Sequence, residues 1–223
     1  ILDREGTIHI DEGKGLETNY LLSLFRDDQG NMWVGSDGGG LELFSGKMFT
    51  YLNRSSGLSS NQVMAITQNR EGLFWFGLDN GIDVLEPNGN LTHYNTNNGL
   101  ADNYVHCFWE DEHRNMWVWT NGGLSIISVD GIVTPGPDKL DGAITSIFPK
   151  KEGVVWVSGA HGLWAIEKDS SYPVNVRHVP NEFVNLIHQD NEGKIWILMP
   201  DKILIEDKGS YDMLKPAGNT SEF

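Results

Sequence analysis

The sequence is poor in cysteine, in positive charge and in long hydrophobic runs, and each shortage excludes a class of protein. The single cysteine, Cys107, cannot form an internal disulfide or build a cysteine-ligated zinc or iron–sulfur site. No apolar run approaches the roughly 20 residues needed to span a bilayer. Sixteen Lys and Arg against thirty-one Asp and Glu give a net charge of −15. Such a surface repels nucleic-acid backbones and anionic membranes, so we expect no nucleic-acid partner.

What is present is enough for a packed core. The 223 residues are 39% hydrophobic and 10% aromatic, which excludes a disordered chain. The chain starts at Ile1 without a basic, apolar leader, so we expect that any targeting segment has been removed. The acidic turns do not match a calcium-binding loop and are interpreted as hairpin turns. We therefore expect a soluble, globular chain with no metal and no cofactor.

The chain is an internal repeat. Five tryptophans are spaced 42, 42, 39 and 40 residues apart. A glycine usually stands three residues before and six residues after each of them, with Arg114 and Lys202 as the exceptions. Gly-Leu followed three residues later by Asn recurs upstream in the first three units. Periods of this length indicate repeated structural units. The five positions are Trp33, Trp75, Trp117, Trp156 and Trp196.

Each unit predicts four short strands and almost no helix. Apolar runs such as Leu21–Phe25, Met32–Gly35, Leu41–Phe44 and Met48–Tyr51 are separated by turns rich in Gly and Asp. Four strands per roughly 40 residues are typical of a β-propeller blade, with the tryptophan between neighbouring blades. The predicted fold class is therefore all-β, with about five blades present.

The predicted boundaries include one surplus strand. Residues 1–14, with Gly6–Ile10 as a strand, would be the end of a preceding blade. The five blades would cover residues 15–56, 57–98, 99–138, 139–180 and 181–223, the last ending with a strand near Tyr211–Leu214. Because a closed ring has no use for a surplus strand, we expect part of a larger propeller, of perhaps seven blades. A closed five-bladed ring is the alternative.

The repeated sequence pattern resembles that of a known family. The pattern GL-x-x-N-x-V-x-x-I-x-x-D-x-x-G-x-x-W-x-G-x-x-x-G-L, clearest at Gly57–Gly81 and Gly15–Leu41, resembles the two-component regulator propeller repeat. The resemblance implies a non-catalytic, periplasmic sensor segment of a hybrid two-component system. Its parent would continue through a membrane helix to a histidine kinase, a receiver and a DNA-binding output. The implied partners are the remainder of that polypeptide and a second copy in a homodimer.

A ligand site is expected where the repeat is broken by residues that the scaffold does not need. Trp119 stands where other units have Gly35, Gly77 or a serine, and its ring would stack on a sugar face. The plainer interpretation of Trp119 is local repacking, and that of His161 is an ordinary turn histidine. The predicted oligosaccharide-binding residues are Trp119, Asn121, His161, Tyr20 and Tyr104.

Two other functions stay open from the sequence. Streptogramin lyases are propellers with a similar Gly-x-x-Trp repeat, and such an enzyme would use His161 or His188 as a base with magnesium. A protein-interaction platform is the third possibility. No Ser-His-Asp triad can be assembled from the spacing, His106 and His188 are interpreted as strand residues, and Cys107 as small buried filler. We therefore expect no catalytic residue in this segment.

Overall fold

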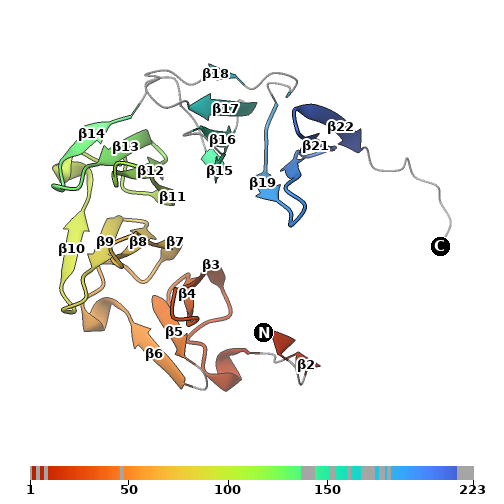
Figure 1. Cartoon of the computed structure of the whole chain (residues 1–223). Coiled ribbons are helices and arrows are strands. Elements are labelled where there is room, and N and C mark those ends of the chain that lie inside the picture. Colours follow the sequence, from red (N-terminus) through yellow and green to blue (C-terminus); the bar gives the residue numbers. More distant parts are fainter. Residues whose placement is uncertain are drawn as a thin grey trace. The chain divides into compact units, whose positions relative to one another are not determined.

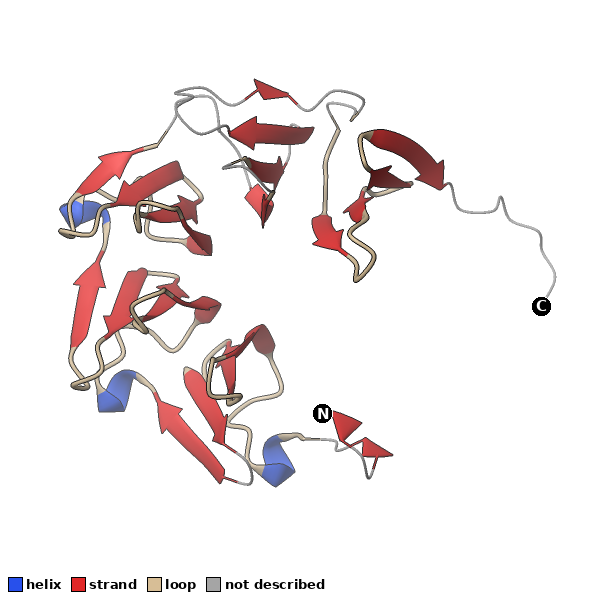
Figure 2. Cartoon of the chain, viewed as in Figure 1, coloured by secondary structure: helices blue, strands red, loops and turns tan. Residues whose placement is uncertain are grey.

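The computed structural model describes residues 2–3, 6–7, 10–45, 48–136, 144–150, 154–159, 162–166, 174–175, 179 and 182–214. This part of the chain holds five four-stranded antiparallel sheets, a two-stranded hairpin and three short 3-10 helices (Figures 1 and 2). The chain divides into two compact units. The first comprises residues 1–121 and 125–135, and the second comprises residues 122–124 and 136–223.

Three of the sheets precede residue 136, and in each of them the strands pair in chain order. The first contains β3 (Leu21–Arg26), β4 (Met32–Ser36), β5 (Leu41–Ser45) and β6 (Met48–Leu52). The second contains β7 (Val63–Gln68), β8 (Phe74–Leu78), β9 (Gly81–Leu85) and β10 (Leu91–Tyr94). The third contains β11 (Val105–Glu110), β12 (Met116–Thr120), β13 (Gly123–Ile127) and β14 (Val133–Pro135).

Two further sheets follow the same order in the second unit. The fourth contains β15 (Ile144–Pro149), β16 (Val155–Gly159), β17 (Gly162–Ile166) and β18 (Val174–Asn175). The fifth contains β19 (Leu186–Gln189), β20 (Ile195–Leu198), β21 (Ile203–Asp207) and β22 (Ser210–Leu214). Five four-stranded sheets of similar design confirm the predicted all-β propeller fold.

The first strand of four sheets carries the same irregularity. The pairing register shifts between Leu21 and Ser23, between Val63 and Ala65, between Val105 and Cys107, and between Ile144 and Ser146. Each shift is a β-bulge, in which one extra residue leaves the ladder and its side chain is re-aimed.

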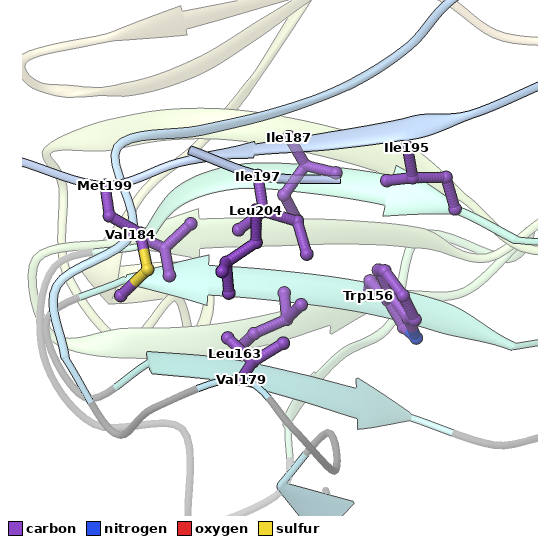
Figure 3. Packing of buried hydrophobic residues seen from close by; sticks show 9 residues of the cluster. All are labelled: Trp156, Leu163, Val179, Val184, Ile187, Ile195, Ile197, Met199 and Leu204. Carbon is purple, nitrogen blue, oxygen red and sulfur yellow. The ribbon is translucent and has the colours of Figure 1, made fainter. Parts of the chain in front are cut away.

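All five repeated tryptophans occupy the second position of the second strand, as predicted. In the first compact unit, Trp33 packs against the neighbouring sheet, with its ring 4.5 Å from the ring of Phe74 and 5.8 Å from that of Phe76. Trp75 repeats the arrangement with Phe108, at 6.2 Å. In the second unit Trp156 belongs to the cluster in Figure 3. These three indoles are buried, whereas Trp117 and Trp196 are half-buried.

Close approach of neighbouring sheets explains the glycine two residues after the tryptophan. A Cβ at Gly35 would lie 2.2 Å from Ser23 Oγ and 2.6 Å from the Val63 carbonyl oxygen. A Cβ at Gly77 would lie 2.8 Å from Val105 Cγ1. A side chain at either position would require neighbouring atoms of the same sheet or of the next sheet to shift.

The N-terminal segment contains part of the predicted strand. Within the predicted range Gly6–Ile10, β2 (Gly6–Thr7) pairs with β1 (Leu2–Asp3) in a short hairpin, and residues 8 and 9 lie outside the described part of the chain. Among the residues that the structure describes, the only helices are three 3-10 turns of three residues each, in agreement with the prediction of almost no helix. None of the helices in the described residues is long enough to cross a membrane.

Candidate functional site

The repeated Gly-Leu-x-x-Asn loops are capping structures. They follow the 3-10 helices η1 (Glu12–Lys14), η2 (Arg54–Ser56) and η3 (Thr96–Asn98). The glycine that ends each helix has φ between 104° and 114°, a left-handed conformation that other residues rarely adopt. The next leucine is buried, and the asparagine side chain accepts a hydrogen bond from the first helical N–H. The motif is therefore explained by local structure alone.

A buried acceptor on the third strand holds each loop to its blade. Glu42 Oε1 accepts from the Glu17 N–H at 3.0 Å, and Ser125 Oγ accepts from the Ala101 N–H at 2.9 Å. Burial raises the pKa of Glu42, whose other carboxylate oxygen has no hydrogen-bond partner among the described residues. In the second blade the equivalent acceptor is Asp83.

Asp83 brings together a serine and a histidine, but without the geometry of a catalytic triad. Its carboxylate accepts from the Ser59 N–H at 2.6 Å and from the Ser59 hydroxyl at 2.7 Å, and His93 Nδ1 lies 2.8 Å away. Ser59 Oγ is 3.1 Å from that same His93 nitrogen. A triad needs the carboxylate and the nucleophile on different ring nitrogens. The cluster anchors a loop instead.

The third blade presents a cluster of polar and aromatic side chains beside its loop. Tyr104 follows the loop asparagine Asn103, and its carbonyl accepts from the Asn121 N–H at 3.1 Å. His106 is the extra residue of the β11 bulge, and its Nε2 lies 2.7 Å from Asn121 Oδ1. The Tyr104 and His106 rings are 5.2 Å apart, tilted by 54°. Tyr104 and His106 are half-buried and Asn121 is exposed.

This third-blade cluster (Tyr104, His106 and Asn121) unites two of the predicted site residues. Tyr20, which holds the position of Tyr104 in the first blade, is 75% exposed. His161 lies outside the described residues. His106 was predicted to be only a strand residue. Its bulge position, which the sequence did not show, gives the imidazole to the cluster.

The prediction for Trp119 is wrong. Its side chain is fully buried in β12, where it pairs with Cys107 and lies 6.1 Å from the Trp117 ring. Residues two apart on a strand face the same side, so Trp119 shares the interior face of Trp117 instead of reaching the end of the blade. Its indole N–H has no hydrogen-bond partner among the described residues. Trp119 is a core residue and cannot stack on a ligand.

The acidic turns between the first and second strands have a role that the sequence did not reveal. The aspartate six residues before the tryptophan accepts the indole N–H, at 3.0 Å in the pair Asp27–Trp33 and at 2.8 Å in Asp190–Trp196. Burial alone would raise the pKa of Asp27, but hydrogen bonds from Asn31, Trp33 and Gln29 hold it below its usual value. The Trp196 indole lowers the pKa of Asp190.

Neither the single cysteine nor any cluster of possible metal ligands among the described residues indicates a reactive site. Burial raises the pKa of Cys107 to about 12, so the thiol is not a nucleophile at neutral pH. Across the described ranges, no group of three or more His, Cys, Asp or Glu side chains is placed to hold a metal ion.

Blades of four strands in chain order, held by one tryptophan per repeat, define a β-propeller protein. Residues 15–38 match the family model described as two component regulator propeller. No curated protein matches the sequence significantly.

Solved structures show the same fold. The extracellular domain assigned to a hybrid two-component system of B. thetaiotaomicron is 20% identical, with a TM-score of 0.80; the match covers 96% of this chain and 31% of that one. A domain assigned to a one-component system of the same organism is 18% identical over 94% of this chain and 31% of the other, with a TM-score of 0.74. Virginiamycin B lyase from Staphylococcus aureus is 17% identical over 90% and 71% of the two chains, with a TM-score of 0.71. The present chain spans about a third of the length of each of these two extracellular domains.

Proposed function

We propose that this chain is part of the extracytoplasmic sensor propeller of a hybrid two-component system and that it binds an oligosaccharide at the third-blade cluster. The family match at residues 15–38 and the similarity to sensor ectodomains support the first part of the proposal. The second part rests on one observation, the contact of Tyr104, His106 and Asn121 at the end of a blade.

The chemistry of the cluster suits a neutral sugar. The Tyr104 ring offers a flat apolar surface with a polar tip, as aromatic residues do in ligand sites. The His106 imidazole and the Asn121 carboxamide supply hydrogen-bonding groups for hydroxyls, and each is already oriented by the other. A strongly anionic glycan would need a basic surface, which a chain of net charge −15 does not offer in bulk.

An exposed apolar face supports membership of a larger propeller. Leu24 of β3 is 68% exposed and Leu21 is 48% exposed. The equivalent residues of β7, Ile66 and Val63, pack with Trp33 of the preceding blade in one cluster. A further blade carrying its own tryptophan would cover Leu24 in the same way.

Ligand binding would then shift the population of two arrangements of a dimeric receptor, by no more than the difference in the ligand's affinity for them.

The proposal is tested by calorimetry with a panel of neutral plant, host and fungal oligosaccharides. At least one should bind, and Tyr104→Ala and Asn121→Ala should each weaken it by about ten-fold, within the roughly 1–3 kcal/mol of aromatic stacking on a ring ligand. Gln62→Ala, at the equivalent position of the second blade, is the matched control and should bind normally. Thermal melting would confirm that all three variants are folded.

Two results would overturn the proposal. If no oligosaccharide binds, or if both cluster variants bind as the unmodified chain does, the cluster is not the site. If the chain cleaves a glycan or a cyclic depsipeptide, and His161→Ala or His188→Ala abolishes the cleavage, the lyase alternative is favoured.

A further inference from the structure

A cleft lies between the second and third sheets, at the ends of the blades opposite to the Gly-Leu-x-x-Asn loops. Its volume is about 120 Å3, and the β7–β8, β9–β10, β11–β12 and β13–β14 turns contribute to its lining. The apolar part of the lining comes from Trp75, Val84, Met116 and Ile127. Asn69, Glu71, Glu86 and Arg114 supply polar groups. Every one of these residues belongs to the first compact unit.

The cleft contains a buried hydrogen-bond donor that the same repeat satisfies elsewhere. The indole N–H groups of Trp33, Trp117 and Trp196 each donate to an aspartate six residues earlier, at 2.8–3.0 Å. Trp75 is only 7% exposed, and its Nε1 has no partner among the described residues. A buried donor left without an acceptor destabilises the unliganded cleft, so a ligand that supplied the acceptor would gain affinity by removing that cost.

The cause is a single change in the repeat. The residue six positions before Trp75 is Asn69, not aspartate. Its Oδ1 accepts from the Glu71 and Leu73 N–H groups at 3.1 and 2.8 Å, as the aspartates do in their own turns. The second atom of the carboxamide is then a nitrogen, which donates hydrogen bonds and cannot accept the indole N–H. Asn69 and Trp75 both line the cleft, so the Trp75 indole lacks there the acceptor that an aspartate supplies in other units.

A second break in the repeat lies on the same rim. Arg114 replaces a glycine and keeps the left-handed backbone, with φ of 66°. Its Nη1 donates to Glu71 Oε1 at 2.8 Å, which joins the second blade to the third across the cleft. A glycine would adopt this left-handed conformation with less strain, so the turn geometry does not explain the presence of Arg114.

The charges and the size define the class of ligand. Glu71 and Glu86 outnumber the single cation Arg114 among the cleft residues, which disfavours an anion. A hydroxyl both accepts and donates, so it can take the Trp75 N–H and donate to a glutamate. The volume equals roughly four waters at about 30 Å3 each. We infer that this cleft binds a neutral hydroxyl-bearing group, such as the hydroxyl-bearing edge of a terminal saccharide residue, with one hydroxyl accepting from Trp75 Nε1.

The inference does not rest on the third-blade cluster and is tested separately, by NMR of the indole N–H groups of the full chain. Methyl glycosides of glucose, galactose, mannose and xylose are titrated in turn. The Trp75 resonance, identified by its loss in Trp75→Phe, should shift in a saturable way with at least one of them. Tyr104→Ala is the control variant and should leave this response unchanged.

Asn69→Asp is the decisive variant because it gives Trp75 an acceptor from within the chain. It should shift the Trp75 resonance without sugar, which also identifies that resonance if Trp75→Phe does not fold. It should raise the melting temperature and weaken the saccharide response at least ten-fold. If no glycoside shifts the resonance, the cleft holds water only and the inference is wrong. An Asn69→Asp variant that keeps the full saccharide response would overturn it equally.

Discussion

Replacing Asp27 by asparagine should reproduce in the first blade the defect that the second blade carries naturally. Asp27 accepts the Gln29 and Asn31 N–H groups through one oxygen, and the Asn31 amide and the Trp33 indole through the other, all at 2.8–3.0 Å. An asparagine can keep the two backbone bonds through its own oxygen. It loses the acceptor of the Trp33 indole, which is 8% exposed and has no access to bulk water as compensation.

The expected cost follows from the bonds that are lost. A hydrogen bond to a charged group contributes about 1.5–3 kcal/mol, and part of this is retained if the turn adjusts. We expect Asp27→Asn to lower the free energy of unfolding by about 2 kcal/mol at pH 7. This corresponds to a decrease of roughly 4–8 °C in melting temperature for a chain of this size. The reverse exchange, Asn69→Asp, should be stabilising by a smaller amount, because Glu71 and Glu110 lie near the same turn.

The effect should depend on pH in one direction. The folded pKa of Asp27 is lowered, so its contribution is fully present above the unfolded pKa of about 3.9 and is lost as the pH falls through the folded value. The difference between Asp27→Asn and the unmodified chain should therefore be largest above pH 5 and shrink toward pH 2. Urea unfolding followed by tryptophan fluorescence at several pH values measures it. A cost that is absent at pH 7, or that stays constant down to pH 2, would refute the reasoning.

Two further predictions concern Trp119, which is fully buried, and Cys107, which is half-buried. Trp119→Ala should destabilise the chain by about 3–5 kcal/mol, as large aromatic deletions do, and chemical denaturation measures this; a neutral effect would mean that the indole is not packed as described. Cys107 should resist a thiol reagent such as iodoacetamide at pH 8 in the folded chain and react after denaturation, because burial raises its pKa to about 12. Rapid labelling of the native chain, followed by mass spectrometry, would contradict that assignment.

The scaffold could be predicted from the sequence because the residues that define each strand and turn recur in several repeats. The spacing of the tryptophans fixed the second strands, and turn residues marked the hairpins between them. The Gly-Leu-x-x-Asn motif recurs in the sequence, and the structure explains why. Its glycine adopts a left-handed conformation, and its asparagine caps a 3-10 helix.

The site was harder to predict because it depends on features without a periodic signal. Trp119 was misplaced although strand alternation from Trp117 already indicates the interior face. His106 could not be recognised, since the bulge that re-aims it follows from pairing between β11 and β12. The hydrogen bond from the Trp33 indole to Asp27 joins a strand to a turn, and the sequence does not show that these two side chains meet. The loss of this hydrogen bond where Asn69 replaces the aspartate before Trp75 could therefore be recognised only from the structure.

Hydrogen exchange with and without a bound oligosaccharide tests most directly whether this propeller senses a ligand at the third-blade cluster. At a saturating concentration of an oligosaccharide selected by calorimetry, amide exchange should slow over residues 103–108 and 120–123, which contain Tyr104, His106 and Asn121. The same segments should exchange at the unliganded rate in Tyr104→Ala under the same conditions. Unchanged exchange in both segments of the unmodified chain, with the oligosaccharide bound, would contradict the account.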